Sequence, residues 1–211
     1  MLDIHPAQRS ANSWKEFFVH IATIVIGLLI AVGLEQTVEY FHHRHLAREA
    51  RASIQRELTE NVSIVQGNNN GLIAEERSLT KDLELLDSGT SDAQTLQALQ
   101  YSWDLRKIED AAWSAARIDG SIALIPSHDI GAADYFYSSN SELIPLVFAY
   151  FTDIDTASAV LDHCRAIGKL PPQERDQLRT LTVSAMGRAN VFLQILPWQL
   201  RAIAGTDLDP H

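Results

Sequence analysis

The sequence predicts an all-α protein, in which an N-terminal transmembrane helix extends into a long helix and is followed by a small antiparallel helical bundle. Three observations predict this class: an uncharged apolar run near the N-terminus, apolar residues at helical spacing through most of the remaining chain, and no strong alternation of the kind that marks a strand. The expected organisation is a tail (1–16), a transmembrane helix with its interfaces (17–41), a juxtamembrane helical extension (42–88), a helical bundle domain (89–206) and a second tail (207–211).

The run from Phe17 to Leu34 has the length and composition of a membrane anchor. Its 18 residues would extend about 27 Å as a helix, and about 17–25 residues span the hydrocarbon core. Trp14 and Tyr40 flank the run with rings at the positions expected for the two interfaces. The lipid bilayer is therefore an expected partner. The alternative is a cleaved signal peptide, whose apolar core is shorter, about 7–15 residues, and follows a basic start.

One face of the anchor carries polar and small residues. His20, Thr23, Gly27 and Ala31 share this face with Glu16. Small residues four apart let two membrane helices approach closely, and polar groups then bond across the contact. We interpret the face as a helix-association surface for another protein or for a second copy of the chain. The alternative is a chance spacing, with His20 leaning out toward the head groups.

The anchor helix is expected to continue beyond the bilayer, because neither a proline nor a strong break occurs between Leu34 and Gln66. Steps of four and three then form a heptad seam: Leu58, Val62, Val65, Asn69, Leu72, Glu76, Leu79, Leu83 and Leu86. The stretch QGNNNG (66–71) resembles a local turn, but the heptad phase is kept across it. We therefore favour a continuous helix with Asn69 at a core position, and we expect later helices of the same chain to cover the seam.

The rest of the chain is expected to form helices joined by short connections. They are predicted from a cap at Thr90–Asp92 to about Gln100, and over Asp104–Arg117, Ile130–Tyr137, Glu142–Ile167 and Pro172–Ala204. A short apolar stretch at Ser121–Pro126 is compatible with an extended conformation. Pro145 would lie in a first helical turn, where no hydrogen bond is lost. The last helix would be kinked at Pro197 and would bury Leu178, Leu181, Ala185, Phe192 and Leu196.

Two short motifs carry a resemblance to a known group. The segment AWSAARIDG places Trp113, Ala116 and Gly120 in a W-x-x-A-x-x-x-G spacing, and ELTEN contributes Glu57 and Asn61. With the anchor, they make the chain resemble uncharacterised bacterial single-pass membrane proteins that have an N-terminal transmembrane helix followed by a small helical domain. The resemblance implies an architecture and a bacterial membrane, but no activity. The spacing also predicts a packing motif, a large ring and two small residues on one helical face.

Composition limits the chemistry and the partners. The formal net charge of −10 argues against nucleic acid, because phosphate binding needs a basic face. Cys164 is the only cysteine, so an internal disulfide and a paired-cysteine zinc or redox site are excluded. No P-loop, Gly-x-Ser-x-Gly motif or Gly-rich dinucleotide turn occurs. We therefore expect no enzymatic activity and no cofactor.

Two functions remain as expectations. The first is a membrane-anchored helical protein-interaction or scaffold module, which binds a protein partner or assembles with itself through an exposed apolar patch near Tyr135–Tyr137. The second is a membrane-tethered pH or metal sensor. Its only candidates are Glu39, His42 and His43, whose helical spacing could bring a carboxylate and imidazoles together, although a complete metal site would need further ligands.

Overall fold

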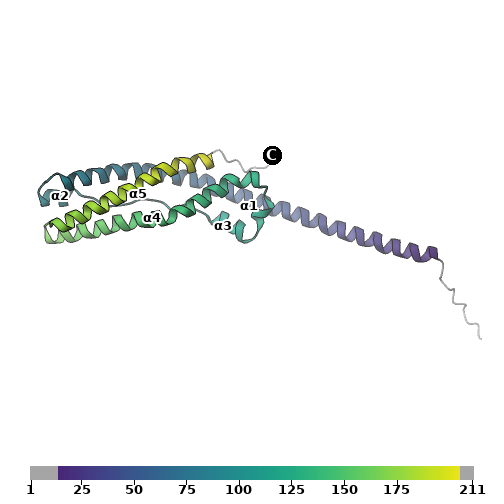
Figure 1. Cartoon of the computed structure of the whole chain (residues 1–211). Helices are drawn as coiled ribbons and strands as arrows, with labels where there is room; N and C mark the ends of the chain where they lie inside the picture. The colour runs from purple at the N-terminus through teal and green to yellow at the C-terminus, as the bar shows by residue number, and fades with distance from the viewer. Residues whose placement is uncertain (1–13, 205–211) are drawn as a thin grey trace, which may run out of the picture. The chain divides into compact units, whose positions relative to one another are not determined.

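The computed structural model describes residues 14–204, which form five α-helices and a short 3₁₀ helix; no strand occurs among these residues (Figure 1). The elements are α1 (Trp14–Asp87), α2 (Asp92–Ala98), α3 (Ala111–Ile118), η1 (Ser121–Leu124), α4 (Ser127–Ile167) and α5 (Pro172–Ala204). The predicted all-α class is confirmed. Most of the expected N-terminal tail and all of the expected C-terminal tail lie outside the described residues.

The chain divides into two compact units, Met1–Leu46 and Ala47–His211. The described part of the first unit is the beginning of α1, and its large apolar side chains from Phe17 to Leu34 are exposed. Two of the described helices, α1 and α4, are long and apolar enough to cross a membrane, and the apolar window of α1 is entirely unburied. From Ala47 on, α1 belongs to the same unit as the later helices.

The second unit is built on three long helices, the part of α1 after Ala47, α4 and α5 (Figure 1). Arg51 of α1 pairs with Asp129 at the start of α4, and α4 ends beside α2, which follows α1 in the chain. Hence α1 and α4 run in the same direction. Asp87, the last residue of α1, pairs with Arg179 near the start of α5 at 2.8 Å, so α5 runs in the opposite direction.

Because α1 and α4 are parallel, the chain must return along the bundle between them. Leu99–Asp110, which we call the return segment, contains no regular helix. The predicted helix over Asp104–Arg117 is therefore wrong in its first half, and only Ala111–Ile118 is helical. The physical reason is length: 14 helical residues would cover about 21 Å, whereas extended chain gains about 3.3 Å per residue.

A second correction concerns α4, for which the sequence predicts two helices separated near Ser141. The structure has one helix from Ser127 to Ile167, with Pro145 in its interior. Phe136 before the polar run and Tyr150 after it are both buried in the same core. Tertiary packing on both sides therefore outweighs the low helix propensity of the Ser-Ser-Asn-Ser run and the missing proline N–H. The predicted last helix agrees with α5.

The seam of α1 is continuous through Gly67–Gly71, as favoured. Its buried positions are Ile54, Leu58, Asn61, Val65, Asn68, Leu72, Leu79, Asp82 and Leu86. They follow steps of four and three, except that the position between Leu72 and Leu79 is the half-buried Glu75. Every second position of the predicted seam is buried, namely Leu58, Val65, Leu72, Leu79 and Leu86, whereas the four positions between them are only half-buried. Asn68 is buried in place of Asn69, and Asp82 in place of Leu83, because the contacting line on the helix lies one residue earlier.

Candidate functional site

Two asparagine side chains of α1 hold the backbone of the return segment. Asn68 Nδ2 donates to the Arg106 carbonyl oxygen, and the Arg106 N–H donates to Asn68 Oδ1, both at 2.8 Å. Asn61 makes the same pair with Glu109, at 2.7 and 2.9 Å. Each side-chain amide thus pairs with the backbone N–H and C=O of one residue in the return segment. In a sheet, a neighbouring strand would pair with these groups. The two asparagines are seven residues apart, a rise of about 10.5 Å along a helix. Their partners Arg106 and Glu109 are three residues apart, and extended chain covers a similar distance at about 3.3 Å per residue.

Glu57 continues this arrangement at the start of α3. Its Oε2 accepts a hydrogen bond from the Ala112 N–H at 2.6 Å, and its Oε1 accepts one from the Trp113 N–H at 3.2 Å. The Tyr137 hydroxyl donates to the same Oε1 at 2.6 Å. A carboxylate on the first N–H groups of a helix also complements the helix dipole. Glu57 therefore caps α3 from a different helix.

Glu75 occupies the heptad position between Asn68 and Asp82. The Asp82 carboxylate accepts a hydrogen bond from the Gln100 N–H. Among the described residues, however, Asp82 Oδ2 and Glu75 Oε1 are both buried without a hydrogen-bond partner. Burial, and secondly the charge of Asp82, raise the pKa of Glu75 to about 7. Burial also raises the pKa of Asp82 to about 6, although the Gln100 N–H lowers it. Asn61, Asn68, Glu75 and Asp82 form the polar ladder of α1.

A cavity of about 240 Å³ lies beside Glu75. Its walls come from α1, the return segment and α4: Gly71, Leu72, Glu75, Ser102, Trp103, Asp104, Leu105 and Tyr150. Trp103 is fixed in this wall, since its Nε1 donates to Asp155 Oδ1 at 3.0 Å and its ring stacks on Phe151 with centroids 4.0 Å apart. Tyr150 is fully buried, and its hydroxyl has no partner within residues 14–204. The cavity therefore combines one unpaired carboxyl oxygen of Glu75, the unpaired Tyr150 hydroxyl and aromatic rings.

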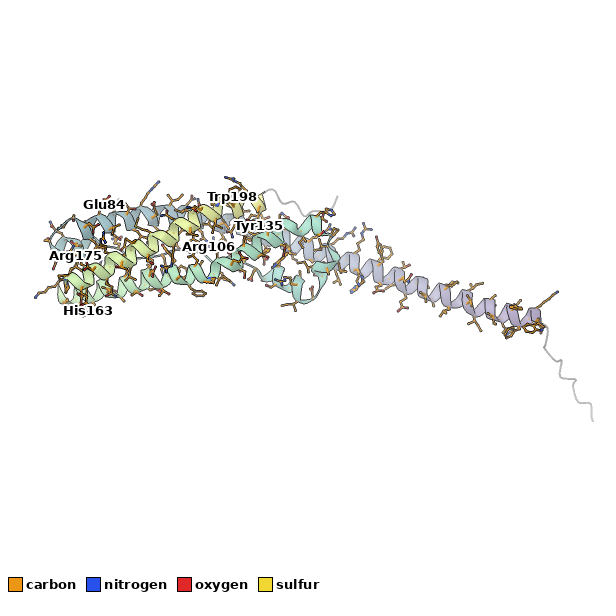
Figure 2. The ribbon with its side chains drawn as sticks, viewed as in Figure 1. Glu84, Arg106, Tyr135, His163, Arg175 and Trp198 are labelled. Atoms are coloured by element: carbon orange, nitrogen blue, oxygen red, sulfur yellow. The ribbon has the colours of Figure 1, made fainter. Side chains whose placement is uncertain are left out.

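An apolar groove of about 530 Å³ shares the lining residues Leu72, Trp103 and Leu105 with this cavity. It is lined by α4, the return segment, α1 and α5: Asn68, Leu72, Trp103, Leu105, Arg106, Lys107, Ile108, Asp110, Asn140, Leu143, Ile144, Val147, Phe148, Phe151, Phe192 and Leu196. Trp103, Ile144 and Phe148 are 41%, 47% and 65% exposed. Arg106 (labelled in Figure 2) and Lys107, both on the return segment, are the basic residues that line the groove. Lys107 Nζ lies 3.7 Å from Asp110 Oδ1.

The apolar patch expected near Tyr135–Tyr137 is wrong in position. Tyr135 is exposed on α4 (Figure 2), but Phe136 and Tyr137 are buried in the core. Tyr137 stacks on Trp113, with ring centroids 4.9 Å apart. Ile144 and Phe148, further along α4, are exposed and line the groove.

The packing motif is only partly helical. Trp113 and Ala116 are buried residues of α3. Gly120 lies beyond the end of that helix and has φ +79°, so it does not share a helical face with them. Its role is to let the chain turn into η1, because this left-handed conformation favours glycine.

The residues of the anchor face lie in the first unit. His20, Thr23, Gly27 and Ala31 are exposed on α1. His20 Nδ1 lies 3.2 Å from the Glu16 carbonyl oxygen, and the Thr23 hydroxyl donates to the Val19 carbonyl oxygen at 2.8 Å. These contacts are internal to the helix, and they leave the face itself without a protein neighbour among residues 14–46.

The weak metal candidates are also in α1. His43 Nε2 lies 3.9 Å from Glu39 Oε1, and the rings of His42 and His43 have centroids 6.3 Å apart. All three side chains are exposed. Within residues 14–204, no group of three or more His, Cys, Asp or Glu side chains is arranged to hold a metal ion. The ligands that a complete site would need are not brought together there.

Sequence reasoning missed the two acidic members of the polar ladder, Glu75 and Asp82, and it chose Asn69 where Asn68 is buried. The available signal was the recurrence of a polar residue every seven positions from Asn61. The neighbouring residues one position later are on average more apolar and have the same period, so they form the more obvious seam, because apolar residues usually mark a core. No protein-family model, no curated protein and no solved structure matches this chain.

Proposed function

We propose that the chain is a single-pass membrane protein of the bacterial cytoplasmic membrane, whose second unit is a protein-interaction or scaffold module without enzymatic activity. The unburied apolar stretch from Phe17 to Leu34 supports the anchor. Side chains of this kind are stable in lipid and unfavourable in water. The other candidate span, α4, packs extensively against α5, which supports a single crossing.

The groove is the observation that carries the interaction module. Trp103, Ile144 and Phe148 remain exposed beside an apolar hollow, although the chain has a large core in which to bury such side chains. Aromatic residues at the centre of a patch and cations at its edge are typical of protein-binding surfaces. The return segment forms one wall, so the polar ladder that holds this segment also shapes the groove.

The anchor is tested by washing membranes from cells that produce the full chain. We expect the protein to remain in the pellet after sodium carbonate or high-salt washing, because a spanning helix is not held by charge. Release into the supernatant by either wash would contradict a spanning anchor.

The groove is tested by placing a photo-crosslinking amino acid at Phe148 in membrane-embedded protein. We expect a discrete adduct, identified by mass spectrometry as a second copy of the chain or another protein. Tyr135 is the matched control, because it is also an exposed aromatic residue of α4 but does not line the groove. Equal labelling at both positions, or none at Phe148, would contradict a docking surface in the groove.

A pH or metal sensor is the second candidate function. The observation in its favour is the approach of His43 to Glu39 at 3.9 Å on the exposed part of α1. Imidazole protonates in the physiological range, and a partner chain could supply the missing metal ligands. This candidate predicts that purified protein retains zinc or a similar ion, and that joint replacement His42→Ala and His43→Ala removes it. Metal content unaffected by the double replacement would reject the metal form of this function.

A further inference from the structure

The cavity beside Glu75 contains two polar groups that the fold leaves unpaired. Tyr150 is 0% exposed, and its hydroxyl has no hydrogen-bond partner in the described part of the chain. Glu75 Oε1 is buried and unpaired in the same way. Each buried polar group without a partner costs about 1–3 kcal/mol. Two such groups on different helices, α1 and α4, line one small cavity, which points to a ligand that satisfies both.

The charged residues that line the cavity, Glu75 and Asp104, are both acidic. Asp82 on α1 raises the pKa of Glu75 by its charge, after burial itself, and Asp104 of the return segment is a further lining residue. From α4 the titratable lining group is Tyr150, and α5 contributes no lining residue. Among the described residues no Lys or Arg forms an ion pair with Glu75. A positively charged ligand would therefore supply the compensation that the protein does not.

The walls favour an organic cation. The rings of Trp103 and Tyr150 line the cavity, and the face of an aromatic ring attracts ammonium groups. The stacking of Trp103 on Phe151 and its hydrogen bond to Asp155 hold that ring in place before any ligand arrives. A volume of about 240 Å³ is below the range of about 300–1,000 Å³ typical of drug-sized ligands, so the ligand is small.

We propose that this cavity, between Glu75 of α1, the Ser102–Leu105 stretch of the return segment and Tyr150 of α4, binds a small organic ammonium ion. The Glu75 carboxylate pairs with the ammonium group, the Tyr150 hydroxyl accepts one of its hydrogen bonds, and the face of Trp103 covers its carbon atoms. Such a site goes beyond a docking surface, and it would make the position of the return segment sensitive to a small molecule.

The test is calorimetric titration of full-length protein in detergent micelles with ethylammonium chloride, against sodium chloride of equal ionic strength. We expect saturable binding of one ion per chain. Glu75→Gln keeps the shape but removes the charge, and it should weaken binding by at least about tenfold. Glu84→Gln is the matched control: it makes the same charge change at an exposed position of the same helix (Figure 2) and should leave the affinity unchanged.

A pH series gives a second readout that needs no variant. Binding requires ionised Glu75, and burial raises the pKa of this carboxyl to about 7. The affinity for ethylammonium should therefore fall as the pH is lowered from about 8 to about 6, since a proton competes with the cation. Absence of saturable binding by the wild-type protein, an affinity independent of pH over this range, or equal binding by a folded Glu75→Gln variant would each overturn the proposal.

Discussion

Asn68 on α1 and Arg106 on the return segment exchange two 2.8 Å hydrogen bonds, in which the side-chain amide of one residue pairs with the backbone N–H and C=O of the other. Asn68 is buried, so water does not readily replace either bond. A shift of the return segment by one residue would leave both backbone groups unpaired. The pair therefore fixes the register of the return segment along α1, and with it one wall of the groove.

The first prediction follows from this pair. Asn68→Ala should lower the free energy of unfolding by about 2–4 kcal/mol, because two hydrogen bonds are lost and the Arg106 backbone is left unpaired. Urea unfolding followed by circular dichroism measures it. Asn69→Ala is the matched control, since Asn69 is only half-buried, and it should change stability by less than about 0.5 kcal/mol. Equal effects of the two replacements would refute the assigned register.

The second prediction concerns the cap that Glu57 provides for α3. Glu57→Gln keeps the volume but turns one acceptor into a donor that faces backbone N–H groups. We expect a loss of about 1–3 kcal/mol in the free energy of unfolding. The near-ultraviolet circular dichroism should also change, because Trp113 and Tyr137 stack beside this carboxylate. Glu60→Gln, at an exposed position one turn later, should change neither quantity.

The long helices could be predicted from sequence because their signals are local. The unbroken apolar run, the preserved heptad phase through Gly67–Gly71 and the prolines that open α5 each depend on neighbouring residues. The return segment could not be predicted in this way. Residues 104–110 have a helical pattern of their own, and only the parallel direction of α1 and α4 requires the chain to be extended there.

The polar ladder could not be predicted from sequence for a related reason. Sequence patterns identify cores by apolar residues, whereas the α1 line facing the return segment alternates aliphatic with polar side chains. Asn61 and Asn68 are buried because they replace the strand that an extended backbone would otherwise need. That use of a polar residue is visible only when the two segments are seen together.

The third prediction is a pH dependence of stability. Burial raises the folded-state pKa of Glu75 to about 7 and that of Asp82 to about 6, above the ordinary values of about 4.3 and 3.9 expected for the unfolded chain. Between these limits the folded protein binds more protons than the unfolded chain, so stability falls as the pH rises. From about pH 5 to about pH 8 the two groups should lower the free energy of unfolding by about 2–4 kcal/mol.

Urea unfolding at a series of pH values measures this slope. Glu75→Gln should flatten it and raise stability at about pH 8, because no charge is then buried at this position. Glu84→Gln, at an exposed position on the same helix, should leave the slope as it is. A wild-type stability that rises over this pH range, or a slope unaffected by Glu75→Gln, would show that Glu75 is not held in a buried, unpaired state.

The last prediction concerns self-association through the anchor. Thr23, Gly27 and Ala31 lie along one exposed face of α1, and a Cβ added at Gly27 would meet no atom of the chain within 4 Å. A leucine at Gly27 is therefore free of clashes within the protomer, and lipid accommodates it readily. A second helix packed closely against this face would be pushed away.

We expect Gly27→Leu to reduce the crosslinking or membrane two-hybrid signal of the full chain. Gly33→Leu is the matched control, because it is another open position of the same helix that lies off this face, and it should preserve the signal. If Gly27→Leu and the wild type gave equal signals, the anchor would be a simple tether, and association would have to come from the second unit.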